Sequence, residues 1–339
     1  GKMAKRRQVK LTHLGLVDPV ETPEGKNVGL ITHLAFMAQI RLDVPSDFLM
    51  DTLVQNLGVS ESKGQYLVFL NGMPCGFTHD AQRLYREFRR YRQYSNIPIN
   101  ASIMLHDQEV FIYSHGEELY RPVIVTANYH RIQPLINTLP PHTLWQQLFI
   151  DGCLEYLNKA EESMVTIGWA PGDTTYLEID PSFTIFGTSS GLIPCSNHNQ
   201  APRNIYQSAM AKQAISAKRP FMNQNRMDKK TFELVYAQKP LVSTEIGRLI
   251  NPTPQGQVVI AAIQCFQGSN QEDSIIFNQA ALDRWLMQAS YRRTYTDSEQ
   301  NHGSDIERFS GTIASEGATV ASNPTADDGL PRVGQHLNP

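Results

Sequence analysis

The sequence contains little cysteine, and the spacing of its cysteines excludes their common structural uses. Only four of the 339 residues are cysteines, Cys75, Cys153, Cys195 and Cys265, and no two of them form a C-x-x-C pair. A zinc knuckle needs closely spaced ligands, and a disulfide-stapled scaffold needs a denser set. We therefore predict buried thiols in a reducing compartment and no zinc site.

The sequence also lacks a charge excess and a long apolar run. Its 30 Lys and Arg residues against 33 Asp and Glu residues give a formal net charge of −3, so any nucleic-acid contact must come from a local basic patch. The stretches 28–40 and 258–266 are too short or too interrupted to cross about 30 Å of hydrocarbon, which predicts no membrane partner. The chain begins at Gly1 and stops at Pro339 without completing an element, and we therefore expect a fragment of a longer polypeptide.

Hydrophobic periodicity predicts a chain of mixed helices and strands. An N-G turn at 71–72 separates two strand-like runs. Leu84, Phe88 and Tyr91 recur at the spacing of a helix over 80–94, whose remaining surface carries five arginines. The patterns predict further strands over 102–105, 110–113, 123–125, 163–169, 184–186 and 258–263, and helices over 144–157 and 204–216. At roughly 150 residues per domain, the length predicts two or three domains.

The stretch G-T-S-S-G at 187–191 matches the G-x-S-x-G pattern of a nucleophile elbow, in which Ser189 would be the nucleophile. An elbow runs directly into a helix, but Pro194 stops helix propagation within one turn here. A turn of small residues therefore explains the stretch better, and a serine hydrolase is the third-ranked hypothesis.

A local basic patch follows this stretch. Residues 203–230 contain one acidic side chain, Asp228, and seven basic ones, Arg203, Lys212, Lys218, Arg219, Arg226, Lys229 and Lys230. Such a surplus suits a polyphosphate or a nucleic-acid backbone, and equally a solvated basic face. In a helix that begins just after Pro202, Arg203, Gln213 and either Asn204 or Tyr206 can face one side.

Two adjacent acids, Glu272 and Asp273, follow an apolar run and a turn. In a strand they would point to opposite faces, so they could hold one cation together only if a bulge or turn re-aims one of them. Mg²⁺ prefers oxygen ligands and often completes its shell with substrate phosphates, so a nearby arginine would favour a metal site. The sequence has no D-x-D-x-D, H-E-x-x-H or G-x-x-x-x-G-K-[ST] pattern, and phosphoryl chemistry would therefore need metal ligands from another chain.

Four segments, in order, resemble the second-largest, β-type subunit of multisubunit DNA-directed RNA polymerases. They are G-K-M-A-K-R-R-Q with T-H-L-G-L-V-D-P-V-E-T-P-E-G-K-N-V-G-L within 1–30, L-I-P-C-S-N-H-N-Q-A-P-R-N-I-Y-Q-S-A-M-A-K-Q-A at 192–214, Q-K-P-L-V-S-T at 238–244 and G-S-N-Q-E-D-S-I-I-F-N at 268–278. Weaker matches extend the resemblance over nearly the whole chain. It implies an α+β multidomain fold of mixed sheets and barrel-like regions with inserted small α+β modules, as part of a larger subunit.

By this resemblance the chain divides into four parts. The implied parts are a fork-loop region at 1–64, an inserted α+β module at 65–130, a second inserted module at 131–175 and the start of the hybrid-binding and active-site region at 176–339. Lys2, Lys5 and Arg7 would contact nucleic-acid phosphates or loop neighbours, and Glu21 and Glu24 would form a structural hinge.

The resemblance also implies roles for residues of the basic patch. Arg203 matches an arginine that contacts the phosphates of the incoming nucleotide, a role that suits its bidentate, permanently charged guanidinium. Tyr206 and Gln213 would line the RNA 3′ end and the substrate site, and Lys212 would add positive charge beside them.

Glu272 and Asp273 match an acidic pair near the Mg²⁺ that the nucleotide carries, and they would hold it directly or through water. With Arg203 they are the implied catalytic residues of template-directed nucleotidyl transfer. The principal Mg²⁺ ligands of the family lie on the largest subunit. The chain would therefore work only with that subunit and the other polymerase subunits, on a DNA template, an RNA transcript and nucleoside triphosphates. A non-catalytic nucleic-acid-binding module is the alternative.

The chain departs from the family pattern at three positions. Asp18 stands where the family usually has cysteine, Ala211 where it usually has glycine, and Glu118 where the inserted module often has arginine. The stretch N-Q-E-D-S at 270–274 resembles the archaeal, eukaryotic and viral branch, and Asp18 with Ala211 favours a large DNA virus as the source. The expected location is intracellular, with nucleus, cytoplasm and viral factory or virion left open.

Overall fold

The computed structural model describes residues 4–62, 64–172, 174–217, 227–303, 305–307 and 309. Within them the strands form four sheets, of which two are mixed and two are two-stranded ribbons. The predicted α+β class is confirmed, but no sheet of the described residues closes into the expected barrel-like regions. None of the described helices is both long and apolar enough to span a bilayer.

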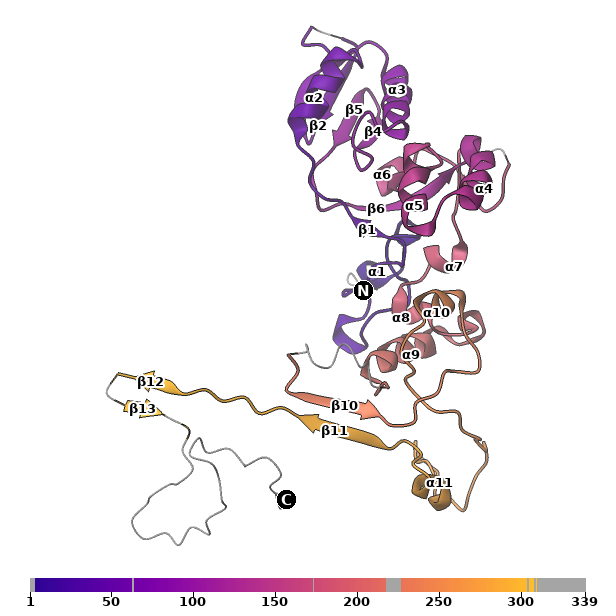
Figure 1. Ribbon diagram of the computed structural model, residues 1–339. Coiled ribbons are helices and arrows are strands. Elements are labelled where there is room, and N and C mark those ends of the chain that lie inside the picture. The colour runs from indigo at the N-terminus through magenta and orange to yellow at the C-terminus, as the bar shows by residue number, and fades with distance from the viewer. Residues whose placement is uncertain are drawn as a thin grey trace.

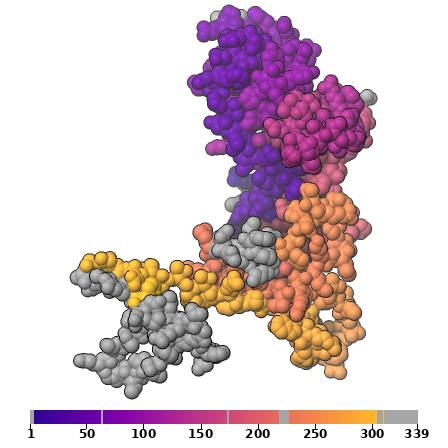
Figure 2. Space-filling model, viewed as in Figure 1, coloured from indigo at the N-terminus to yellow at the C-terminus, as the bar shows by residue number. Residues whose placement is uncertain are grey.

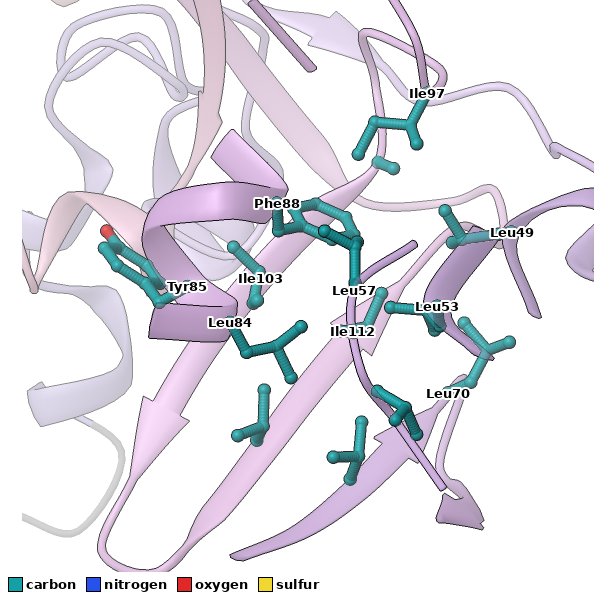
Figure 3. Packing of buried hydrophobic residues seen from close by; sticks show 14 of the residues in the cluster. Leu49, Leu53, Leu57, Leu70, Leu84, Tyr85, Phe88, Ile97, Ile103 and Ile112 are labelled. Atoms are coloured by element: carbon teal, nitrogen blue, oxygen red, sulfur yellow. The ribbon is translucent and has the colours of Figure 1, made fainter. Parts of the chain in front are cut away.

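One mixed sheet has the strand order β3-β2-β5-β4 (Figure 1). Its strands are β2 (Tyr66–Leu70), β3 (Met73–Thr78), β4 (Ser102–His106) and β5 (Glu109–Tyr113). Asn71 and Gly72 join β2 to β3 with positive φ angles of 51° and 80°, the backbone of a tight two-residue hairpin. Helices α2 (Ser46–Gln55) and α3 (Ala81–Gln93) pack against this sheet. The hydrophobic core between them includes Leu53, Leu84 and Ile112 (Figure 3).

Helix α3 confirms the helix predicted over 80–94. The Asp80 side chain accepts a hydrogen bond from the Arg83 amide at 2.9 Å and so caps the first turn. Leu84 and Phe88 are buried in the core of the sheet, as their i, i+4 spacing requires. The expectation that all five arginines cover the helix surface is wrong for Arg92, which is 2% exposed.

Strand β6 (Leu119–Val125) is the centre of the second mixed sheet. Its partners are β1 (Gln39–Ile40), β7 (Leu154–Asn158) and β9 (Tyr176–Leu177), and β9 pairs in parallel with β8 (Ile167–Gly168). Helices α4 (Tyr129–Thr138) and α5 (Pro141–Ile150) pack on this sheet through a core that includes Leu148 and Phe149.

The helix predicted over 144–157 is wrong in its second half. Helix α5 ends at Ile150, and Gly152 takes a positive φ of 66° that stops helical hydrogen bonding. The residues of β7 that follow are all buried and pair with β6. Tertiary pairing therefore overrides the local helical pattern. The strand predicted over 163–169 is also shorter than expected, because only β8 forms there.

The second half of the chain consists of short elements around α9 (Figure 1). They are α7 (Pro181–Thr184), α8 (Thr188–Gly191), α9 (Ala201–Gln213), α10 (Glu245–Ile250), α11 (Gln279–Asp283), and the ribbons β10 (Lys230–Leu234) with β11 (Ala289–Arg293) and β12 (Gln300–His302) with β13 (Asp305–Glu307). The other short helices are α1 (Ala4–Arg7), α6 (Lys159–Glu162) and the single 3₁₀ turns η1 (Leu11–His13), η2 (Gly25–Asn27), η3 (Thr126–Asn128) and η4 (Ser196–His198). Figure 2 shows that the chain after β11, as far as β12, extends away from the rest of the molecule.

Two strands predicted in this half are wrong, whereas the helix predicted near 204–216 is confirmed by α9. At 184–186 the Asp180 side chain caps the helical turn α7, so the chain enters this stretch as a helix. The run 258–263 is apolar, but none of the described residues pairs with it as a neighbouring strand. Its Ile260 and Ile263 are consequently fully exposed.

A buried charge network joins the two mixed sheets. The Arg92 guanidinium on α3 donates to Glu155 on β7 at 2.9 Å and to Glu161 on α6 (Lys159–Glu162) at 2.7 Å, and all three are at most 2% exposed. Burial alone would raise the pKa of Glu155, but the charges of Arg92 and Arg89 outweigh it and lower that pKa. At Glu161, burial dominates and raises the pKa.

Glu155→Gln should therefore destabilise the chain far more than Glu161→Gln. Both oxygens of Glu155 accept hydrogen bonds, one from Arg92 and the other from Gln93 at 3.1 Å and Tyr176 at 2.5 Å. In Glu155→Gln, the NH₂ group of the amide would replace one of these accepting oxygens and would face hydrogen-bond donors on its neighbours. Glu161 uses only Oε1, which accepts from Arg92 and from the Ile103 amide at 3.2 Å, and glutamine keeps that oxygen.

We expect Glu155→Gln to lower the free energy of unfolding by about 3–5 kcal/mol. Glu161→Gln should lower it by no more than about 1 kcal/mol, the worth of one hydrogen bond. Urea unfolding at neutral pH, followed by circular dichroism, measures both. The pKa of Glu155 is lower in the folded chain than in the unfolded chain, where it is about 4.3. The ionised carboxylate therefore contributes to the free energy of unfolding above that unfolded pKa, and the contribution is lost as the pH falls through the folded pKa. Equal losses in the two variants would contradict this assignment.

Candidate functional site

Helix α9 and the turn before it form the candidate site. Pro202 occupies the first turn, where a missing amide hydrogen leaves no helical bond unmade. The buried Asn204 donates to the Ser196 carbonyl at 2.8 Å and accepts from Asn199 at 3.0 Å, which holds the start of α9 to η4. Ser208 is buried one turn later, and α9 packs against α8. One side of α9 is thereby fixed to the fold.

The other side of α9 borders a pocket of about 730 Å³. Arg203, Tyr206 and Gln213 line it from α9, and Glu24 lines it from the first segment of the chain. The remaining lining residues are Ile193, Pro194, Asn199, Gln207, Ala209 and Met210. The Arg203 guanidinium lies 5.5 Å from the centre of the Tyr206 ring, a cation–π distance. Arg203 is exposed and takes part in no ion pair among the described residues, so its planar fork is available to an anion.

Lys212 lies on α9 but does not line this pocket. Its ammonium group forms an ion pair with Glu21 at 2.6 Å and approaches His33 at 3.4 Å. Glu21 is 7% exposed and also lies 3.3 Å from His33. This cluster ties the segment that carries Glu21 and Glu24 to the C-terminal end of α9.

The basic residues at the start of the chain, Lys2, Lys5 and Arg7, differ in their contacts. Lys2 lies outside the described residues, and Lys5 is exposed on α1. Arg7 donates to the carbonyls of Lys26 and Val28 at 2.6 Å and 2.9 Å. The described contacts of Arg7 thus hold the loop that follows Glu24.

Glu272 and Asp273 lie in a turn and not in a strand. Both have positive φ angles, 51° and 69°, an uncommon backbone for a glutamate in particular. The Asn270 side chain organises this turn, because it accepts from the Phe266 amide at 2.9 Å and donates to the Gln264 carbonyl at 2.6 Å. No strand therefore directs the two carboxylates to opposite faces.

Both acids are exposed, and neither lines the pocket of Arg203. Among the described residues no three His, Cys, Asp or Glu side chains gather as a metal site. Two carboxylates can supply only part of the six oxygen ligands of Mg²⁺. A cation bound by Glu272 and Asp273 would therefore need its other ligands from outside the described residues.

The G-T-S-S-G stretch forms α8, and its buried hydroxyl is that of Ser190, which donates to Asp18. Within the described part of the chain, no hydrogen bond joins Ser189 to a histidine, and α7 stands where an elbow needs a strand. The serine-hydrolase hypothesis thus gains no support. Asp18 thus joins the first segment of the chain to α8, although the sequence analysis noted it only as a departure from a family pattern. Its one local signal is its place before Pro19, a common start of a turn.

Three family models match the chain in order. They are RNA polymerase Rpb2 domain 3 at residues 1–40, domain 4 at 68–127 and domain 6 at 189–339. The last range contains α9 and the turn with Glu272 and Asp273.

Curated proteins with related sequences agree with these matches. The chain is 32% identical to DNA-directed RNA polymerase II subunit RPB2 of Schizosaccharomyces pombe, over 93% of this chain and 31% of that protein. It is 31% identical to DNA-directed RNA polymerase II subunit 2 of Arabidopsis thaliana, over 100% of this chain and 31% of that protein. It is 33% identical to DNA-directed RNA polymerase subunit Rpo2 of Saccharolobus shibatae, over 86% of this chain and 28% of that protein. The chain therefore spans less than a third of the length of these relatives.

Reversing the Glu21–Lys212 pair should show how strongly it holds α9. We expect Glu21→Lys and Lys212→Glu each to lower the free energy of unfolding by about 1–3 kcal/mol. Each single variant places two like charges at positions 21 and 212, and position 21 is nearly buried. The double variant should recover at least about half of the summed loss. Urea unfolding measures the cycle.

The exposed pair Glu245–Arg248, also 2.6 Å apart, is the matched control. Its reversal should change the free energy of unfolding by less than about 0.5 kcal/mol at each step. A Glu21–Lys212 cycle no larger than this control would show that the pair does not fix α9.

Proposed function

Because the chain belongs to the family of Rpb2-type second subunits of DNA-directed RNA polymerases, we propose that its α9 pocket binds the phosphates of a nucleoside triphosphate during RNA synthesis. The observation that supports this most directly is Arg203, an exposed guanidinium without an ion pair among the described residues, held over Tyr206 at the edge of the pocket. A volume of about 730 Å³ falls in the range of small-molecule sites.

The proposed reaction is nucleotidyl transfer to an RNA 3′ end. The 3′-hydroxyl oxygen attacks the α-phosphorus, and the bond from that phosphorus to the oxygen bridging the α- and β-phosphates breaks. Pyrophosphate leaves, and the hydroxyl proton passes to water. Arg203 donates two parallel hydrogen bonds to phosphate oxygens and neutralises part of their charge. The Tyr206 ring restricts the directions that the guanidinium can take, and the Gln213 amide offers a donor and an acceptor to the RNA end or the substrate. Lys212 does not line the pocket, but its ion pair with Glu21 attaches α9 to the first segment of the chain.

Glu272 and Asp273 are the residues of this chain that we assign to the Mg²⁺ carried by the nucleotide. The ion, when bound, neutralises charge on the phosphates. The assignment is supported by the oxygen chemistry of the two acids and by the turn that removes them from a strand. The principal metal ligands belong, in this proposal, to the largest subunit.

We propose the corresponding partners as well. They are the largest and the other polymerase subunits, a DNA template and an RNA transcript, and the location is intracellular. Lys5 on α1 is exposed and has no ion pair among the described residues, so it can meet nucleic-acid phosphates, whereas Arg7 is occupied by its loop. A non-catalytic module that tracks phosphates is the second candidate, because an exposed arginine also serves that purpose.

In the assembled polymerase, Arg203→Ala should raise the apparent KM for every nucleoside triphosphate about 10–100-fold. This range corresponds to the loss of charge-assisted hydrogen bonds worth about 1.5–3 kcal/mol. Arg203→Lys should fall in between, since it keeps the charge but not the fork. Single-nucleotide addition at varied triphosphate concentration measures the effect. Arg83→Ala, an exposed arginine on α3, is the matched control and should leave KM unchanged. Normal kinetics combined with weaker binding of nucleic acid would instead support the non-catalytic module.

Glu272→Gln and Asp273→Asn should change the Mg²⁺ requirement of the same assembled enzyme. We expect each variant to raise the Mg²⁺ concentration for half-maximal rate about 3–10-fold, because a neutral amide is a poorer ligand for a hard cation. Asp283→Asn, on the nearby helix α11, controls for the loss of one exposed carboxylate. An unchanged Mg²⁺ dependence in both variants would remove the two acids from the metal assignment.

A further inference from the structure

The Asp18 carboxylate is a buried centre of four hydrogen bonds. Oδ1 accepts from the amides of Val20 and Glu21 at 2.8 Å and 3.2 Å. Oδ2 accepts from the Gly187 amide at 2.8 Å and from the Ser190 hydroxyl. Asp18 is 4% exposed, and no ion pair of the described residues includes it. Among the described residues, only these four neutral donors stabilise the buried Asp18 carboxylate. The loss of any one of them should therefore weaken its position.

The two oxygens connect the two sides of the α9 pocket. On the Oδ1 side, the amides of Val20 and Glu21 begin the segment that carries Glu24 to the pocket. On the Oδ2 side, Gly187 and Ser190 belong to α8 and its N-cap, and α8 packs against α9. Asp18 thus contacts both segments that place pocket-lining residues, although it lines no part of the pocket itself.

The packing around this carboxylate is close. A Cβ on Gly187 would lie 2.7 Å from Asp18 Oδ2 and 2.7 Å from the Leu34 carbonyl oxygen, so even a methyl group does not fit without a shift. A hydrogen bond of 2.8 Å from the Phe36 amide to the Phe186 carbonyl joins the same two segments beside it. The position of Asp18 is therefore set from both segments.

We propose that Asp18 is a positioning residue of the α9 pocket, which fixes the separation between Glu24 on one side and Arg203 on the other. This inference rests on the proposed function, because its effect is defined as the placement of Arg203 against a triphosphate. The physical reason is that displacements of about 1 Å at a binding group can change a rate about 100-fold. Four hydrogen bonds to one carboxylate suppress such displacements.

Asp18→Asn in the assembled polymerase tests the proposal. Asparagine has the same shape, but its NH₂ group must face two of the four donors whichever way the amide turns. We expect KM for nucleoside triphosphates to rise about tenfold, with kcat within about twofold and subunit assembly unchanged. Asp80→Asn, which alters the capping carboxylate of α3, is the matched control and should leave both constants unchanged. An unchanged KM in Asp18→Asn would overturn the proposal.

A double-mutant cycle with Arg203→Ala separates this inference from the proposed function. If Asp18 acts through Arg203, adding Asp18→Asn to Arg203→Ala should raise KM by less than about twofold further. A full additional tenfold rise would show that Asp18 acts elsewhere and would overturn the inference while leaving the role of Arg203 intact. If Arg203→Ala alone leaves KM unchanged, the proposed function itself fails.

Ser190→Ala provides a second variant should Asp18→Asn fail to assemble. It removes one of the four donors and no charge, and we expect a smaller rise in KM of about threefold. Gly187→Ala disturbs the same carboxylate from its other side and should raise KM at least as much. Normal KM values in both variants would contradict the positioning role.

Discussion

Buried arginines paired with carboxylates hold the first half of this chain together. Arg92 donates to Glu155 and Glu161 between the two mixed sheets. Arg121, on the central strand β6, donates to Glu162 and Glu178, and it is 3% exposed. Removing the arginine from such a group leaves uncompensated carboxylates in the interior, which costs several kcal/mol. Through Arg92, these contacts hold α3 of one mixed sheet against β7 of the other.

This network reaches the candidate site through the first segment of the chain. Gly15 lies directly against the Arg121 side chain, where a Cβ would come within 2.5 Å of the guanidinium Nε. Three residues later, Asp18 binds the start of α8, and Glu21 then binds Lys212 on α9. A single short segment thus connects the charged interior of the sheets with the helix that carries Arg203. The pocket takes Glu24 from that segment and most of its other lining from α9.

Features that depend on local spacing were predictable from the sequence, and those that depend on distant partners were not. The hairpin at Asn71 and the helix α3 follow from a turn dipeptide and from an i, i+4 pattern. The stretch 154–157 was predicted as helix but belongs to β7, because β6 supplies a strand to pair with. The run 258–263 has the composition of a strand but finds no such partner among the described residues. Periodicity reports which face is apolar, whereas a strand also needs a neighbour.

The sequence by itself determined the family, through four ordered motifs, and it placed Arg203, Gln213 and either Asn204 or Tyr206 on one helix face. The structure selects Tyr206 for the pocket, because Asn204 is buried. Only the tertiary structure decided what the charged residues near them do. Arg203 is left without an ion pair among the described residues, Lys212 is engaged by Glu21, and Asp18 binds an amide 169 positions away. The physical reason is that the role of a charged group depends on its burial and on the partner within hydrogen-bond distance. Spacing along the chain encodes neither of these.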